Sequence, residues 1–142
     1  MVHQSWPLQE QAQHFELGLI LNSAVADIIE PCEVGALGVQ HSGLWECDLA
    51  DDSLIWSGGV YDIFGLPRGA VVTRKEALGF YSERSRATMQ RLRSYAIRKG
   101  CGFTLDAEIL PGVGGRRWMR IIGAPAFSGN GTRRLHGLKF IV

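Results

Sequence analysis

The sequence predicts an α+β domain with a five-stranded antiparallel sheet, short helices inserted after the second strand, and an amphipathic helix before the first strand. Three observations predict this class. Residues 43–57 have the pattern of a strand hairpin, residues 82–99 that of a helix, and residues 103–142 that of three further strands. A chain of 142 residues is long enough to bury one hydrophobic core, so we expect a single globular unit.

The first predicted element is an amphipathic helix from about Leu8 to Glu30, bounded by Pro7 and Pro31. Apolar residues recur in it at helical spacing on more than one side, which a monomer has difficulty covering. We therefore expect one side to pack on the sheet and the other to pair with a second copy in a homodimer. The expected interface residues are Phe15, Leu17, Leu21, Ala24 and Ile28. The alternative is a helix folded wholly onto its own domain.

A strand hairpin is predicted over residues 43–57. Residues 43–49 alternate in polarity, which is the pattern of a half-buried strand. The apolar side of this strand carries Trp45, Cys47 and Leu49. The turn Asp51-Asp52-Ser53 is too short to connect parallel strands, so residues 54–57 are expected to return antiparallel to the first strand.

Helical segments follow the hairpin. Residues 60–78 contain only short helical fragments, because glycine and proline interrupt them. A longer helix is predicted from about Ser82 to Lys99, with Met89, Leu92 and Ala96 on one face. Glycines at 100 and 102 end it.

Three strands complete the domain, at residues 103–109, 116–127 and 133–142. A turn at residues 111–115 and the Asn130-Gly131 pair separate them. In the first of these strands apolar residues (Phe103, Leu105, Ala107 and Ile109) alternate with polar ones (Thr104, Asp106 and Glu108).

Two strand positions bear on function. On the last strand, His136 lies on the same side as Leu138 and Phe140. If that side faces the helices, His136 points into a cavity under them. A histidine satisfied in the core or at the sheet edge is the commoner case. Asp106 and Glu108 alternate with core positions, so we expect them to face outward and not to form an acid/base pair.

The element order and several local motifs resemble the PAS family, in particular its tryptophan-rich subclass, from about Gly38 to Val142. The motifs are Trp45, Ile55-Trp56-Ser57, Tyr61-Asp62-Ile63-Phe64-Gly65, Tyr81-Ser82-Glu83-Arg84-Ser85-Arg86, and Gly115-Arg116-Arg117-Trp118-Met119. In this order they are specific. Where many members read His-Pro-Glu-Asp-Arg, this chain begins with Tyr81-Ser82, so roles of the histidine and proline are not carried over.

The resemblance implies a cytoplasmic, non-catalytic sensor domain at residues 38–142, preceded by a helix and connector at residues 1–37. It implies a small ligand or partner and an output domain beyond Val142, such as a histidine kinase or diguanylate cyclase. The family keeps its ligand between the sheet and the inserted helices, where these residues are expected: Trp56, Phe64, Tyr81, Met89, Leu92, Phe103, Leu105, His136 and Phe140. The alternatives are a filled core and a ligand-free dimerisation or protein-interaction module.

Cofactor motifs are missing from the sequence. A flavin photoreceptor of the LOV type carries Gly-Arg-Asn-Cys-Arg-Phe-Leu-Gln after the first short helices, and haem-binding relatives supply an axial histidine from the helices. This chain has no such segment and no histidine between Ser57 and Gly102. We therefore expect no cofactor, neither flavin nor haem. The three cysteines and four histidines show no metal-ligand spacing, so no metal site is expected.

Composition excludes several other classes. A net charge of +1 disfavours nucleic-acid binding, and the arginine stripe at Arg84, Arg91 and Arg98 is expected to be a solvated helix face. The longest apolar window, residues 17–29, is too short for a membrane span, and the N-terminus lacks a signal-peptide pattern. No nucleophile-elbow pattern surrounds Ser57, so the chain is not expected to be an enzyme.

Overall fold

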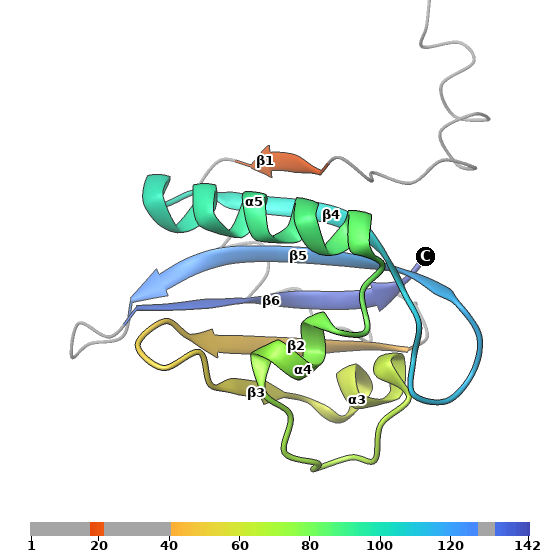
Figure 1. Cartoon of the computed structure of the whole chain (residues 1–142). Coiled ribbons are helices and arrows are strands. Elements are labelled where there is room, and N and C mark those ends of the chain that lie inside the picture. The colour runs from red at the N-terminus through yellow and green to blue at the C-terminus, as the bar shows by residue number, and fades with distance from the viewer. Residues whose placement is uncertain (1–17, 22–40, 128–132) are drawn as a thin grey trace, which may run out of the picture.

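The computed structural model describes residues 18–21, 41–127 and 133–142, which form one antiparallel sheet and three helices. The strand order across the sheet is β1-β4-β5-β6-β2-β3 (Figure 1). The strands are β1 (Leu19–Leu21), β2 (Ser42–Asp48), β3 (Leu54–Trp56), β4 (Gly102–Ile109), β5 (Arg117–Phe127) and β6 (Arg133–Ile141). The helices are α3 (Gly58–Phe64), α4 (Arg74–Leu78) and α5 (Glu83–Lys99).

The β2–β3 hairpin forms as predicted, with Trp45 opposite Trp56. Local hydrogen bonds fix its turn: the Asp48 carboxylate accepts from the Ala50 N–H at 2.8 Å, and the Asp51 carboxylate accepts from the Ser53 N–H at 3.0 Å. Such bonds between an aspartate and the backbone two residues later stabilise tight turns. The predicted five antiparallel strands are confirmed, as is the insertion of helices after the second.

Each helix has an end signal in the sequence. Ser82 begins α5 by accepting from the Ser85 N–H at 3.2 Å, and Thr73 begins α4 through a capping box with Glu76. Helix α3 ends at Gly65, whose φ of +65° lies in the left-handed region. A β-carbon there would also come within 2.6 Å of the Val113 nitrogen, so this position requires glycine.

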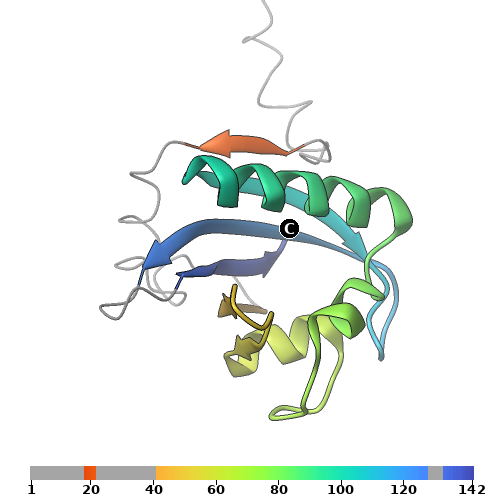
Figure 2. The same ribbon diagram turned by 60° about the vertical axis from the view of Figure 1, so that its left-hand side comes forward.

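The helices lie together on one face of the sheet (Figures 1 and 2). The predicted apolar face of α5 is buried against this side, through Met89, Leu92 and Ala96. The central strands contribute fully buried side chains to the same core: Phe103, Leu105, Ile109, Met119, Ile121 and Leu135. We call this side the helix-covered face, and the other the second face.

The prediction of a continuous N-terminal helix is wrong at Leu19–Leu21, which form strand β1 and pair antiparallel with β4. Without β1, the edge of β4 would present unpaired N–H and C=O groups. The Leu-Ile-Leu segment pairs with that edge as a further strand. Pairing with the sheet therefore overrides the local helical spacing. The rest of the predicted helix lies outside the described residues, as do Phe15, Leu17, Ala24 and Ile28 of the expected dimer interface.

The expected phase of β6 is also wrong. Directly paired residues on neighbouring strands share a face, and Trp45 and Cys47 of the core pair with Gly137 and Leu135. Leu135, Gly137 and Lys139 therefore face the helices, while His136 and Phe140 lie on the second face. Leu138, on the second face, is only 2% exposed. Because β6 has buried residues on both of its sides, polar and apolar residues do not alternate along it, and the sequence does not show which side faces the helices.

Candidate ligand-binding site

A groove and a small cavity lie beside one another between the β2–β3 hairpin and helices α4 and α5. The groove has a volume of about 750 Å³ and is lined by residues 51–54, Trp56, Tyr61, residues 69–75, Leu78 and Gln90. The cavity measures about 40 Å³ and lies deeper, against β2 and β6. Leu54, Arg74 and Leu78 line both, so the two spaces adjoin.

Lys139 of β6 lines the cavity and is only 6% exposed. Its ammonium lies over three aromatic rings, 5.1 Å from the centroid of Trp45, 5.6 Å from Trp56 and 5.2 Å from Phe64. Trp56 and Phe64 stack on each other with their centroids 4.9 Å apart. The electron-rich ring faces attract the cation, but burial disfavours its charge and lowers the pKa of Lys139 to about 7.

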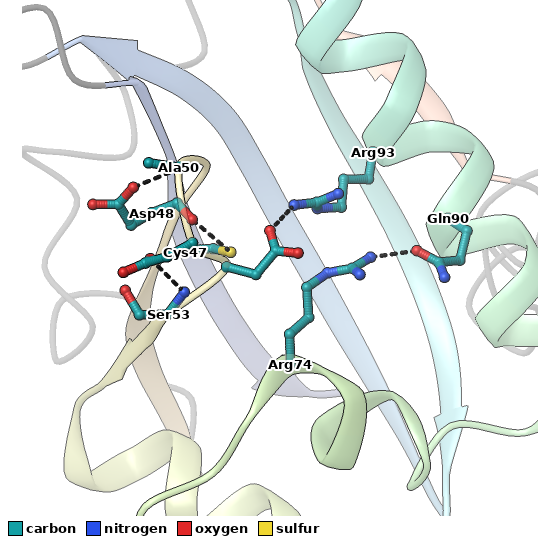
Figure 3. Close-up of polar contacts among 9 residues, drawn as sticks. Cys47, Asp48, Ala50, Ser53, Arg74, Gln90 and Arg93 are labelled. Atoms are coloured by element: carbon teal, nitrogen blue, oxygen red, sulfur yellow. Dashed lines mark hydrogen bonds and ion pairs between the residues drawn. The ribbon is translucent and has the colours of Figure 1, made fainter.

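Two arginines reach the same site from the helices, Arg74 from α4 and Arg93 from α5 (Figure 3). Arg93 donates to the Asp52 carboxylate at 2.9 Å, and Arg74 donates to the Gln90 side chain. Burial lowers the pKa of Arg74, and the positive charge of Arg93 lowers it further. Two guanidinium groups thus lie close enough to repel each other, and the Asp52 carboxylate binds Arg93.

Two neutral groups complete the cavity. The Cys47 thiol is 3% exposed, and burial raises its pKa although a hydrogen bond with Arg93 opposes the change. Burial also raises the pKa of Tyr81 well above the usual range of a phenol. Both groups therefore stay protonated near neutral pH and supply no negative charge to the three cations.

The structure brings together some of the expected ligand-site residues. Trp56 lines the groove, Tyr81 and Met89 line the cavity, and Phe64 packs against Trp56. Leu92, Phe103 and Leu105 lie on the helix-covered face as buried core residues, away from both spaces.

His136 and Phe140 do not reach the site, because they occupy the opposite phase of β6. His136 pairs across the sheet with Glu46 and Ala124 on the second face. Its Nε2 is buried without a hydrogen-bond partner among the described residues. The placement of these two residues in a cavity under the helices is therefore corrected.

The sequence analysis missed the three cations. Lys139 stands between Leu138 and Phe140 near the end of β6, and the sequence analysis assigned it no role. Arg74 belongs to a helix of five residues, too short for periodicity to show which way it points. The sequence does hold one usable signal: the chain has only three lysines beside twelve arginines, so a lysine within a long strand is unusual for it.

Ser57 and Asp62 both have structural partners. The Ser57 hydroxyl accepts from the Leu44 N–H at 2.9 Å, and the Asp62 carboxylate binds Arg68 at 2.6 Å. Within the described ranges, no three histidine, cysteine or carboxylate side chains gather as a metal site. In that same part of the chain, no helix is both long and apolar enough to cross a membrane.

No protein-family model and no curated protein matches the chain, but solved structures do. The N-terminal domain of a Marinobacter aquaeolei diguanylate cyclase with a PAS/PAC sensor has a TM-score of 0.62 at 14% identity, over 70% of this chain and 94% of that one. A sensory box histidine kinase/response regulator from Burkholderia thailandensis has a TM-score of 0.57 at 18% identity, over 78% of this chain and 85% of that one. An RNA-binding light-oxygen-voltage receptor has a TM-score of 0.60 at 15% identity, over 70% of this chain and 29% of the receptor.

The comparisons contradict the expectation of no cofactor. A light-oxygen-voltage receptor, a fungal blue-light photoreceptor and a fungal LOV photoreceptor share this fold, so it is one that flavin photoreceptors use. A cavity of about 40 Å³ holds only a few water-sized groups and does not fit a three-ring flavin. The groove of about 750 Å³ is the part of the site with volume for one.

The likeness to these structures rests on geometry, since identities of 14–18% carry little sequence signal. In this chain the fold consists of an antiparallel sheet with the order β4-β5-β6-β2-β3, extended by β1, and of helices inserted between β3 and β4. This chain has the PAS domain fold.

Proposed function

We propose that this chain is a cytoplasmic, non-catalytic sensor domain that binds a small ligand under its helices and signals to an output domain. Residues 38–142 form the sensor, and residues 1–37 form an N-terminal extension that contributes β1 to the sheet. The output is a signalling enzyme such as a histidine kinase or a diguanylate cyclase. Solved domains of both kinds of protein share the fold, which supports this choice.

The groove with its adjoining cavity is the observation that carries the proposal. Its volume of about 750 Å³ falls in the usual range of ligand sites, roughly 300–1,000 Å³. Its walls combine apolar groups, such as Trp56 and Val72, with polar groups, such as Asp52 and Gln90. Apolar walls with a few fixed polar groups are typical of small-molecule sites.

The Arg93–Asp52 ion pair suggests how a ligand would alter the fold. It joins α5 to the β2–β3 turn across the mouth of the site, at 2.9 Å. A ligand that takes Arg93 from Asp52 would release the hairpin from the helix, and the hairpin continues into the sheet. Arg93 is 15% exposed and Asp52 50% exposed, so the pair lies where a ligand would enter.

A second candidate is a ligand-free module for dimerisation or protein interaction. The exposed apolar residues of the second face favour it: Leu44 is 48% exposed and Ile55 is 64% exposed. Apolar groups on a sheet face are a common contact between copies of a domain. A homodimer through this face is compatible with ligand binding on the other.

Native mass spectrometry of freshly purified protein tests the first candidate. We expect an added small-molecule mass that disappears on denaturation. Ala70→Trp, which fills the groove, should abolish the added mass, whereas Val113→Trp at an exposed site away from the groove should retain it. An apo mass alone, together with no ligand-induced rise in melting temperature in a metabolite screen, would favour the second candidate.

A further inference from the structure

The small cavity has the size of one ionised group. A site needs roughly 10–15 Å³ of such volume for each water, so about 40 Å³ admits roughly three atoms of that size. A carboxylate has three heavy atoms. The adjoining groove would take the rest of a molecule whose carboxylate enters the cavity, because Leu54, Arg74 and Leu78 border both spaces.

Positive charge around this cavity exceeds negative charge. Lys139, Arg74 and Arg93 line it, and no carboxylate does. The Asp52 carboxylate lies in the groove, where it binds Arg93. Cys47 and Tyr81, the other titratable groups facing the cavity, are uncharged at neutral pH for the reasons given above.

Lys139 is the most deeply buried of the three cations and has no counter-ion among the described residues. Among the described residues, its ammonium contacts three aromatic rings and pairs with no carboxylate. Aromatic rings attract a cation without cancelling its charge. A buried charge normally has a partner of opposite sign. For Lys139 no such anion is found among the described residues.

We propose that this cavity binds the carboxylate of a small monocarboxylic acid, held by Lys139 together with Arg74 and Arg93. The proposal rests on the sensor function proposed above and names the chemical class of its ligand. The body of the acid lies in the groove against Trp56 and Val72, which favours an apolar or aromatic body.

Phenylacetate and its uncharged analogue phenylacetamide are suitable probes, because they differ in charge and hardly in shape. We expect phenylacetate to bind the 142-residue chain at least about 10-fold more tightly in calorimetric titrations, as for a charge-assisted hydrogen bond. Lys139→Met should weaken phenylacetate about 10-fold or more and leave phenylacetamide unchanged. Lys99→Met, an exposed position, is the matched control and should change neither.

Proton uptake gives a second readout that needs no variant. A carboxylate bound beside Lys139 keeps the lysine protonated, so at pH 8 binding should take up close to one proton. Titrations in two buffers of different ionisation enthalpy measure this number. Binding of phenylacetate without proton uptake would overturn the role of Lys139, even if the Lys139→Met variant failed to fold.

The outcomes separate this inference from the sensor function. Equal affinity for the acid and the amide, an unaffected Lys139→Met variant, or no saturable binding of formate, acetate, benzoate or phenylacetate would each overturn the carboxylate site. A neutral molecule retained in native mass spectra would overturn it while leaving the sensor function intact. A retained carboxylic acid that Lys139→Met loses would support both.

Discussion

Asp106 and Lys139 are both charged side chains buried in the same sheet, but they lie on opposite faces and have different partners. Asp106, fully buried on the second face, accepts two hydrogen bonds from the Arg120 guanidinium at 2.7 and 3.0 Å. Lys139, 6% exposed on the helix-covered face, has only aromatic rings around its ammonium. The first charge is neutralised within the protein, and the second is not.

This difference distinguishes a buried charge that stabilises the fold from one that does not. A bidentate carboxylate–guanidinium pair satisfies both groups and fixes neighbouring strands in register, and Asp106 and Arg120 are directly paired residues of β4 and β5. Its hydrogen bond raises the pKa of Arg120. An unneutralised lysine stabilises nothing of that kind. Its burial costs free energy, which deprotonation reduces and which a bound anion would offset.

The largest expected effect comes from breaking the paired charge. Asp106→Asn should lower the free energy of unfolding by about 4 kcal/mol, because it breaks the buried bidentate pair with Arg120. Urea denaturation measures the change. The control is Asp62→Asn, whose pair with Arg68 is exposed and should contribute far less to stability. Equal losses in the two variants would show that Asp106 is not a structural charge.

Lys139→Met should change the free energy of unfolding in the opposite direction, towards higher stability. Replacing an unneutralised buried cation by an apolar side chain of similar length should raise the free energy of unfolding by about 3 kcal/mol at pH 6. Lys99→Met, at an exposed position, should change it by less than about 0.5 kcal/mol. A destabilised Lys139→Met variant would mean that the aromatic rings outweigh the burial cost, and the comparison above would fail.

The gain from Lys139→Met should depend on pH. The pKa of Lys139 is lowered to about 7 in the folded state from an ordinary 10.5, so between these values the unfolded chain binds more protons. The stability of the wild type therefore rises with pH across this window, relative to the variant. The gain should fall from about 3 kcal/mol at pH 6 to under about 1 kcal/mol at pH 10. A gain that is independent of pH would contradict the lowered pKa.

The smallest effect concerns the rings. Trp56→Leu removes one of three aromatic faces from Lys139 and should lower the pKa of that lysine further, by about 0.5–1 unit, because a cation–π contact contributes about 0.5–2 kcal/mol. Tyr95→Leu, at an exposed ring on α5, is the control. An unchanged or raised pKa in Trp56→Leu would show that the ring does not stabilise the charge.

Much of the fold could be predicted because its elements are marked locally. The β2–β3 hairpin has a tight acidic turn, α5 has Ser82 at its start and Gly100 at its end, and β4 to β6 are separated by glycine-rich turns. These signals involve neighbouring residues only. The strand at Leu19–Leu21 could not be predicted, because it depends on an edge more than 80 residues away in the chain.

The site was predicted less well than the fold, because both faces of the sheet bury apolar groups. Leu138 and Phe140 suggested one inward phase for β6, while the true inward phase carries Leu135, Gly137 and Lys139. Asp106 was expected to face solvent and is fully buried beside Arg120. In both cases polarity was taken to indicate exposure. Pairing partners on other strands decide the matter, and a single sequence does not reveal them.

The central claim is that the fold buries Lys139 without a counter-ion, and its pKa tests that claim most directly. The chain has three lysines, so a ¹³C-lysine-labelled sample gives three Cε signals, and Lys139→Met identifies the one of interest. The signals are followed from pH 5 to pH 11 in ligand-free protein. We predict a midpoint near 7 for Lys139. A midpoint at 10 or above would contradict the account, because it would mean that the ammonium is solvated or already paired with an anion of the protein.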